Sequence, residues 1–257
     1  NRLYDILLHV KKDIPEDERI LLVDVDDTSI EKVGVWPWSR DIMANGLVTM
    51  SELGAEYTVF DIEYVQKSPA AVDPSFLIND IPAAFQDEFE IINQNIAELF
   101  GAIASGALPL EVAEDYILDL TLLNEQTKDI LIAKVAEVAR DNDSVFAGSI
   151  YLYDDVFFTV NMVDDYEVEL PEEYEQWILD NIAYDDIEVN TELYPVAESI
   201  DPTLSQLLYN SSGAGFPNII IDEDGVRRRI EFFTEYQGRF FAQLVIAPML
   251  EWMGNPK

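Results

Sequence analysis

The sequence predicts an α/β fold with a mixed central sheet, helices on its faces and a helical insertion. Three observations carry this prediction. Short apolar runs bounded by charged residues alternate with amphipathic helical segments. Hydrophobic residues make up 49% of the 257 residues, which is enough for a sizeable core. A middle segment, at about 66–127, has helical character throughout, so we expect one domain over residues 1–257 that carries this segment as an insertion.

The charge of the chain excludes some partners. It has 51 acidic and 15 basic residues, a formal net charge of −36. Nucleic acids and anionic membrane surfaces attract basic proteins, so we expect neither as a partner. The chain has no cysteine, which excludes disulfides and thiol chemistry and disfavours a structural zinc site. No cofactor motif is present, and we expect no cofactor.

The first quarter of the chain predicts a βαβ unit. Residues Arg2–Lys12 form an amphipathic helix, and Arg19–Val25 is a short apolar run typical of a buried strand. The polar residues Asp26 to Ser29 then serve as turn or cap residues. A helix follows from Arg40 to Leu53, and a second strand over Tyr57–Ile62. Two strands joined through a helix are expected to be parallel.

The middle segment predicts helices. Its apolar residues recur at spacings of three and four, which places them on one helical face: Phe85, Phe89, Ile92, Ile96, Leu99 and Ile103. A second helix is expected from Pro109 to about Leu123, and a third over Thr127–Arg140. Val156–Val160 predicts a strand with which the α/β pattern resumes.

The last third mixes both kinds of element. A helix is expected over Glu172–Asn181. Strands over Asn218–Ile221 and Arg228–Phe233 are joined by an Asp-Gly turn, a strong hairpin signal. Residues Arg239–Met253 predict an apolar helix that Pro248 kinks. It is expected to pack on the sheet through Phe240, Leu244 and Ala247.

Four short segments combine acidic, aromatic and basic residues at expected strand ends, where α/β proteins usually bind ligands. They are DVDDTS (24–29), GVWPWSR (34–40), FDIEY (60–64) and DEDGVRRR (222–229). We expect Arg40 and Arg228 within salt-bridge reach of the carboxylates of Asp24, Asp26, Asp61 and Asp222, because clustered carboxylates repel without a cation. The role stays open between a structural ion-pair network, a site for a cation or ligand, and catalysis. The candidate residues are Asp24, Asp26, Asp27, Ser29, Trp36, Trp38, Arg40, Asp61, Glu63, Asp222, Asp224 and Arg228.

The two tryptophans of the second segment flank Pro37. Side chains two positions apart in extended backbone point the same way, so the rings of Trp36 and Trp38 are expected to bury together. They form either part of the core or an aromatic wall for a ligand.

One enzymatic alternative starts at Asp24. The string DVDDT resembles the first motif of haloacid-dehalogenase-type phosphatases, which implies Asp24 as nucleophile and Asp26 as acid/base, with magnesium. That family also needs a lysine and a later acidic pair. Lys134 is a loose match, and neither Asp154–Asp155 nor Asp164–Asp165 follows a convincing apolar strand.

A second resemblance accounts for all four segments. The chain resembles the second type of CHASE domain, the cyclase and histidine kinase associated sensory extracellular domains. The motifs that match are VDVDDTSI, GVWPWSR, LGAEYTVFDIEY and DEDGVRRRIEFF. They cover roughly residues 19–65 and 200–250, and the middle third departs from the pattern.

This resemblance implies a role for the chain. Such domains lie outside the cytoplasmic membrane, tethered by transmembrane helices to a nucleotide cyclase, histidine kinase or Ser/Thr kinase. We therefore expect an extracytoplasmic (periplasmic) sensor of a small-molecule or ionic signal that is not itself an enzyme, and a homodimer is compatible with this role. The chain starts with Asn and contains no apolar run long enough to span a bilayer, which suits an excised receptor ectodomain.

Overall fold

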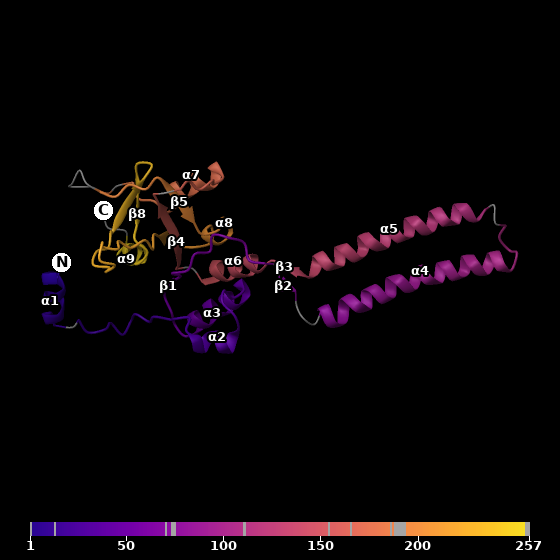
Figure 1. The fold of residues 1–257 in the computed structure, drawn as a ribbon, viewed down its shortest axis with the longest axis horizontal. Helices are drawn as coiled ribbons and strands as arrows, with labels where there is room; N and C mark the ends of the chain where they lie inside the picture. The colour runs from indigo at the N-terminus through magenta and orange to yellow at the C-terminus, as the bar shows by residue number, and fades with distance from the viewer. Residues whose placement is uncertain are drawn as a thin grey trace. The chain divides into compact units, whose positions relative to one another are not determined.

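The structure is a computed structural model. It describes residues 2–12, 14–69, 71–72, 76–109, 112–153, 155–164, 166–185, 187 and 194–254. The chain divides into two compact units, residues 1–38 and residues 39–257. Figure 1 shows that the second unit mixes helices and strands, as the α/β prediction required. No helix in the described ranges has the length and apolar character that a membrane crossing needs.

The first unit contains helices α1 (Arg2–Val10) and α2 (Asp27–Val33). The predicted N-terminal helix is confirmed. The predicted buried strand Arg19–Val25 is wrong: this segment forms no strand, and the four apolar residues 20–23 are 65–89% exposed. A strand is stabilised by a hydrogen-bonded neighbour. Within the described residues this segment pairs with no other strand, so its apolar pattern alone does not fix it as one.

A mixed sheet forms the centre of the second unit. Its strands are β1 (Thr58–Val59), β4 (Val156–Val163), β5 (Ser199–Pro202) and β6 (Gly213–Gly215). Strand β4 pairs in parallel with β1 and β6, and antiparallel with β5. The predicted strand at 156–160 is therefore confirmed and extends further. The strand expected over Tyr57–Ile62 is shorter than predicted, and its parallel partner is β4 rather than the segment 19–25.

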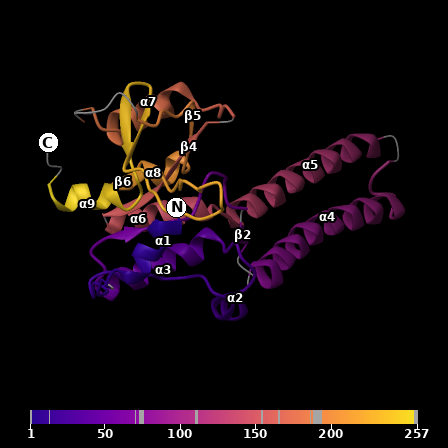
Figure 2. The same cartoon turned by 60° about the vertical axis from the view of Figure 1, so that its left-hand side comes forward.

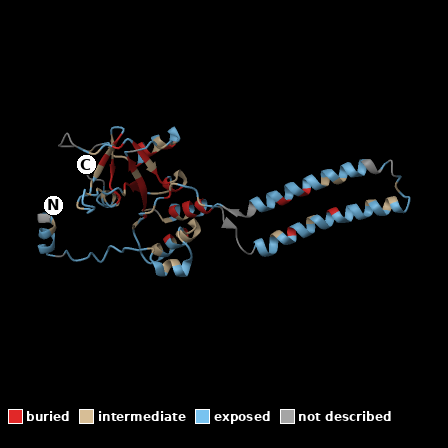
Figure 3. Cartoon of the chain, in the orientation of Figure 1, coloured by how far each residue is buried: buried red, intermediate tan, exposed pale blue. Residues whose placement is uncertain are grey.

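The core surrounds β4, which is buried over nearly its whole length (Figure 3). Its side chains alternate between two clusters, as the period of a strand requires. Phe158 stacks on Phe60 with ring centroids 5.3 Å apart, and Phe146 meets Phe60 edge to face at 5.4 Å. Phe157, on the other face, packs in a smaller cluster with Ala242 and Ala247. The sheet is therefore covered on both faces.

The larger core cluster includes residues of helices α3 (Arg40–Glu52), α6 (Asn142–Tyr153), α7 (Glu172–Asn181) and the single turn α8 (Ser205–Leu208). Helix α6 packs against both α3 and α8. The predicted helices at 40–53 and 172–181 are confirmed. Helix α6 was not predicted, although the string DNDS at 141–144 precedes an apolar run in the manner of a helix start.

Two long helices form a hairpin between β1 and β4 in the sequence. They are α4 (Ile81–Ala104) and α5 (Ala113–Val138), preceded by the π-helical turn η1 (Phe76–Asp80). The short strands β2 (Ala71–Val72) and β3 (Ala139–Arg140) pair antiparallel on either side of them. The helices predicted at 109–123 and 127–140 are one continuous helix. Figures 1 and 2 both show α4 and α5 side by side.

The C-terminal segment corrects one prediction. Instead of a helix over Arg239–Met253, the chain forms an antiparallel pair of strands, β7 (Phe233–Tyr236) and β8 (Arg239–Ala242), and only then helix α9 (Ile246–Trp252). The apolar run is compatible with a helix or a strand, and hydrogen-bonded pairing with β7 stabilises the strand. Pro248 lies in the first turn of α9, where a missing N–H leaves no helical bond unmade, rather than mid-helix as predicted. Leu244 and Ala247 are buried as expected, whereas Phe240 is only partly buried.

Candidate functional site

A buried ion pair joins the first turns of α3 and α6. The guanidinium Nε of Arg40 lies 3.3 Å from Oδ1 of Asp143, and the two side chains are only 12% and 3% exposed. Arg40 also donates a hydrogen bond from Nη2 to the carbonyl oxygen of Gln66 at 3.2 Å. Charges that are this well covered are expensive to desolvate, so each depends on the other.

Two further polar side chains complete this cluster. The Arg40 guanidinium carbon lies 4.1 Å from the centre of the Tyr64 ring, a cation–π contact. Tyr64 and Asn142 are each 1% exposed. Within the described part of the chain, the Tyr64 hydroxyl and both amide atoms of Asn142 make no hydrogen bond. Buried polar groups are nearly always satisfied, so a bound water or a small ligand is expected to complete the hydrogen bonds of these atoms.

Local sequence explains how the cluster is positioned. Asp141 accepts hydrogen bonds from the backbone N–H groups of Asp143 and Ser144 at 3.1 and 3.2 Å, which is the arrangement of a helix N-cap. It thereby holds the backbone of Asp143 in the first turn of α6. The second carboxylate oxygen of Asp143 accepts from the backbone N–H of Ser68 at 2.8 Å. The loop that follows β1 is thus tied to the start of α6.

Burial also sets the electrostatics of Tyr64. Its pKa is raised well above the ordinary value by burial, an effect that the neighbouring Arg40 charge partly opposes. The phenol therefore stays neutral and keeps a proton to donate. We name Arg40, Tyr64, Asn142 and Asp143 the Arg40 cluster. Together they offer a cation, a carboxylate, a hydroxyl and an amide.

Sequence analysis found this cluster only in part. Arg40 was a candidate residue, and Tyr64 lies in the FDIEY string without being one. Asp143, the carboxylate that pairs with Arg40, was not singled out, because helix α6 was not predicted. The helix-start signal at 141–144 would have pointed to it.

The last candidate segment forms a turn held by ion pairs. Arg228 donates from Nη1 to Asp222 at 2.9 Å, and contacts both carboxylate oxygens of Asp224 at 2.7 and 2.8 Å. Asp222 also accepts from Arg229 at 2.6 Å. Gly225, with φ of +79°, closes the turn. The expected contact between Arg228 and Asp222 is confirmed. The expected salt bridge between Arg40 and Asp61 or Asp222 is wrong, because Arg40 pairs with Asp143 instead. The strands expected over 218–221 and 228–233 are not found. Instead of a ladder of paired residues, one isolated bridge joins Ile220 to Arg229.

These ion pairs predict a pH dependence. Hydrogen bonds from the Arg228 guanidinium lower the pKa of Asp224 from 3.8 to about 2. Because the pKa is depressed in the folded state, the stabilisation is complete above the unfolded value and is lost as pH falls toward 2. We expect an NMR titration of the Asp224 carboxyl carbon to show this depressed pKa. In Arg228→Gln it should return toward 3.8. An unshifted pKa in the parent protein would show that the contact is absent in solution.

The candidate residues of the first unit have local roles. Asp26 caps α2: its carboxylate accepts from the Ser29 backbone N–H at 2.8 Å, and this bond lowers the pKa of Asp26. Asp24 and Asp27 are exposed. The rings of Trp36 and Trp38 are half-buried and meet edge to face at 5.4 Å, as expected for side chains that bury together. The Trp38 indole N–H donates to the Gly34 carbonyl oxygen at 2.8 Å.

Two candidates follow β1 in the second unit. Asp61 and Glu63 are exposed, and Glu63 lies close enough to Asp201 on β5 to raise its pKa, although burial raises it more. Clustering of Asp61 with Asp24 and Asp26 stays a prediction. Among the residues described, no three acidic or histidine side chains gather in a way that would hold a metal ion. Within the described residues, Asp24 follows an exposed segment without strand pairing, which gives no support to a phosphatase site there. Asp164 directly follows the buried strand β4, so the expectation that this acidic residue follows no apolar strand is wrong.

Comparison with known proteins identifies one family. A family model described as the CHASE2 domain matches residues 1–253, essentially the whole chain. No curated protein and no solved structure matches.

Proposed function

Because the chain belongs to the CHASE2 domain family, a family of extracellular sensory domains, we propose that it is the signal-binding part of a membrane-bound receptor. The output is a nucleotide cyclase, a histidine kinase or a Ser/Thr kinase. The domain lies on the extracytoplasmic side and carries no catalytic activity of its own. Its acidic surface suits an aqueous compartment and repels anionic lipid.

The Arg40 cluster is the single observation that carries a signal-binding role. A sensor needs an element with two arrangements that a ligand stabilises to different extents. The cluster joins three segments that are distant in sequence: the start of α3, the loop after β1 and the start of α6. Its unpaired hydroxyl and amide would gain hydrogen bonds from a small polar ligand. Such a gain would shift how the three segments pack.

Receptor output tests this role. In the full-length receptor, Arg40→Met combined with Asp143→Leu replaces the ion pair by apolar side chains and removes the polar contacts that join the three segments. We expect basal output in membranes to change at least about fivefold, which is the lower range of coupling between two sites. Arg229→Ala, which removes an exposed arginine from a different ion pair, serves as control. The control is expected to give the output of the parent. If the double variant does so as well, the Arg40 cluster is excluded as the sensing element.

A further inference from the structure

The α4–α5 hairpin leaves a broad apolar surface uncovered. Among the side chains of α4 and α5 whose burial the structure describes, few are buried: Ala84, Ile92, Thr127 and Leu131. Beside this seam runs a stripe of exposed apolar residues on α4, at spacings of four and seven, which places them on one face: Phe85, Phe89, Ile96 and Phe100. Ile132 and Val135 continue the surface on α5, at 59% and 45% exposure. We name these six residues the hairpin stripe.

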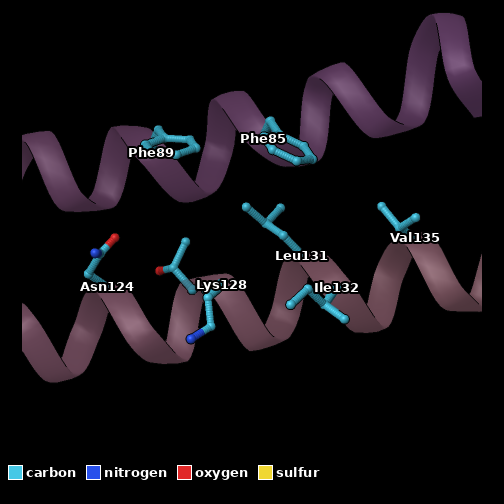
Figure 4. A pocket seen from close by; sticks show the side chains of 8 residues that line it. Phe85, Phe89, Asn124, Lys128, Leu131, Ile132 and Val135 are labelled. Carbon is cyan, nitrogen blue, oxygen red and sulfur yellow. The ribbon is translucent and has the colours of Figure 1, made fainter.

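The stripe borders a groove between the two helices. Figure 4 shows Phe85 and Phe89 on α4 and, across the groove on α5, Leu131 and Val135 pointing toward α4, with Ile132 beside them. The cavity between them has a volume of about 430 Å³ and is lined mostly by apolar side chains. A groove with aromatic walls of this kind accepts apolar side chains from a partner.

Most acidic residues of α4 lie away from this surface. At 3.6 residues per turn, Asp87, Glu90 and Glu98 fall on faces other than that of the stripe, whereas Glu88 falls beside the seam and is partly buried. On α5, Lys128 lines the groove and is paired with Glu125. The six residues of the stripe can therefore be covered without covering the carboxylates of Asp87, Glu90 and Glu98.

We propose that a second copy of this chain covers the hairpin stripe, so that two hairpins form a four-helix bundle. Two helices cannot enclose an apolar core, whereas four can. The six side chains, of about 150–200 Å² each and about half exposed, present roughly 500 Å² of apolar surface per copy. A stable interface buries about 800 Å² per partner, of which about 60% is apolar, so the stripe matches what one copy must contribute.

The net charge of −36 makes this association depend on salt. Two such chains repel each other, and salt screens the repulsion. Sedimentation velocity of the 257-residue chain should therefore show a dimer that tightens from about 50 mM to about 500 mM NaCl. A basic peptide or another basic partner would show the opposite dependence, because salt weakens attraction between opposite charges.

Matched variants on α4 locate the interface. Phe89→Ser and Ile96→Ser remove apolar side chains of the stripe, and each should weaken dimerisation at least about tenfold. Ile91→Ser is the control: it is the same change on the same helix, at an equally exposed position that lies on another face. Circular dichroism melting checks that each variant is folded. The salt dependence of dimerisation is measured on the parent protein alone, so that test does not depend on whether a variant folds.

The outcomes decide the proposal. A parent dimer that Ile96→Ser weakens and Ile91→Ser preserves supports it. A parent that stays monomeric at high salt overturns it, as does a dimer that all three variants form equally well. Neither result depends on whether the chain senses a signal.

Discussion

Arg40→Ala is expected to lower the free energy of unfolding by roughly 3–5 kcal/mol, because it leaves the Asp143 carboxylate buried without its cation. The carboxylate is 3% exposed and, among the described residues, keeps the Ser68 backbone N–H as its one hydrogen-bond donor from another segment. For a chain of this size the loss corresponds to a fall in Tm of roughly 10 °C. Differential scanning calorimetry measures both quantities.

Two further variants separate the ion pair from the loss of an arginine in general. Arg19→Ala removes an arginine that is 78% exposed and pairs with Asp17 two residues away, so Tm should stay unchanged. Arg40→Met combined with Asp143→Leu removes both charges and should recover most of the stability, because apolar replacement of a buried pair is often neutral. If Arg40→Ala melts like the parent, the two charges are not buried in solution.

Gly215→Ala is expected to destabilise the protein by about 2–3 kcal/mol or more. A β-carbon at this position would lie 2.6 Å from the α-carbon of Leu244 and 2.8 Å from the carbonyl oxygen of Ala242. Both atoms belong to backbone, which cannot rotate away as a side chain does. The segment around Leu244 must therefore move away from β6. Chemical denaturation should show the lower free energy of unfolding.

Gly148→Ala is the matched control with the opposite sign. Gly148 lies in the interior of α6, and a β-carbon there meets nothing within 4 Å. Alanine restricts the unfolded chain and favours helix, so stability should rise by about 0.5–1 kcal/mol. Equal effects of the two substitutions would mean that β6 and the segment 242–244 are not packed this closely.

Sequence patterns predicted the fold where local signals and tertiary packing agree. Helices α3 and α7 and strand β4 were expected because their periodicity and end signals are unambiguous. The structures of segments 19–25 and 239–253 were predicted wrongly because an apolar run is compatible with several structures, and the presence or absence of a pairing strand selects among them. Arg239–Ala242 forms a strand because it pairs with β7. Strand β7 precedes residues 239–253, so the pattern of those residues alone does not reveal this pairing.

The site shows the same division. The pairing of Arg228 with Asp222 was predictable because one turn holds both residues. The partner of Arg40 was not, because Asp143 is distant in sequence and belongs to a helix that was not predicted. Open polar atoms such as those of Asn142 depend on packing alone, and composition gives no sign of them.

Protease accessibility of the full-length receptor tests the extracytoplasmic sensor role most directly. Spheroplasts of the producing cells are treated with a protease that does not cross the cytoplasmic membrane, and fragments are detected with antibodies against this domain and against the output domain. If this domain is extracytoplasmic, it should be digested in intact spheroplasts, while the output domain should be digested only after lysis. A domain that stays protected until the membrane is broken would contradict it.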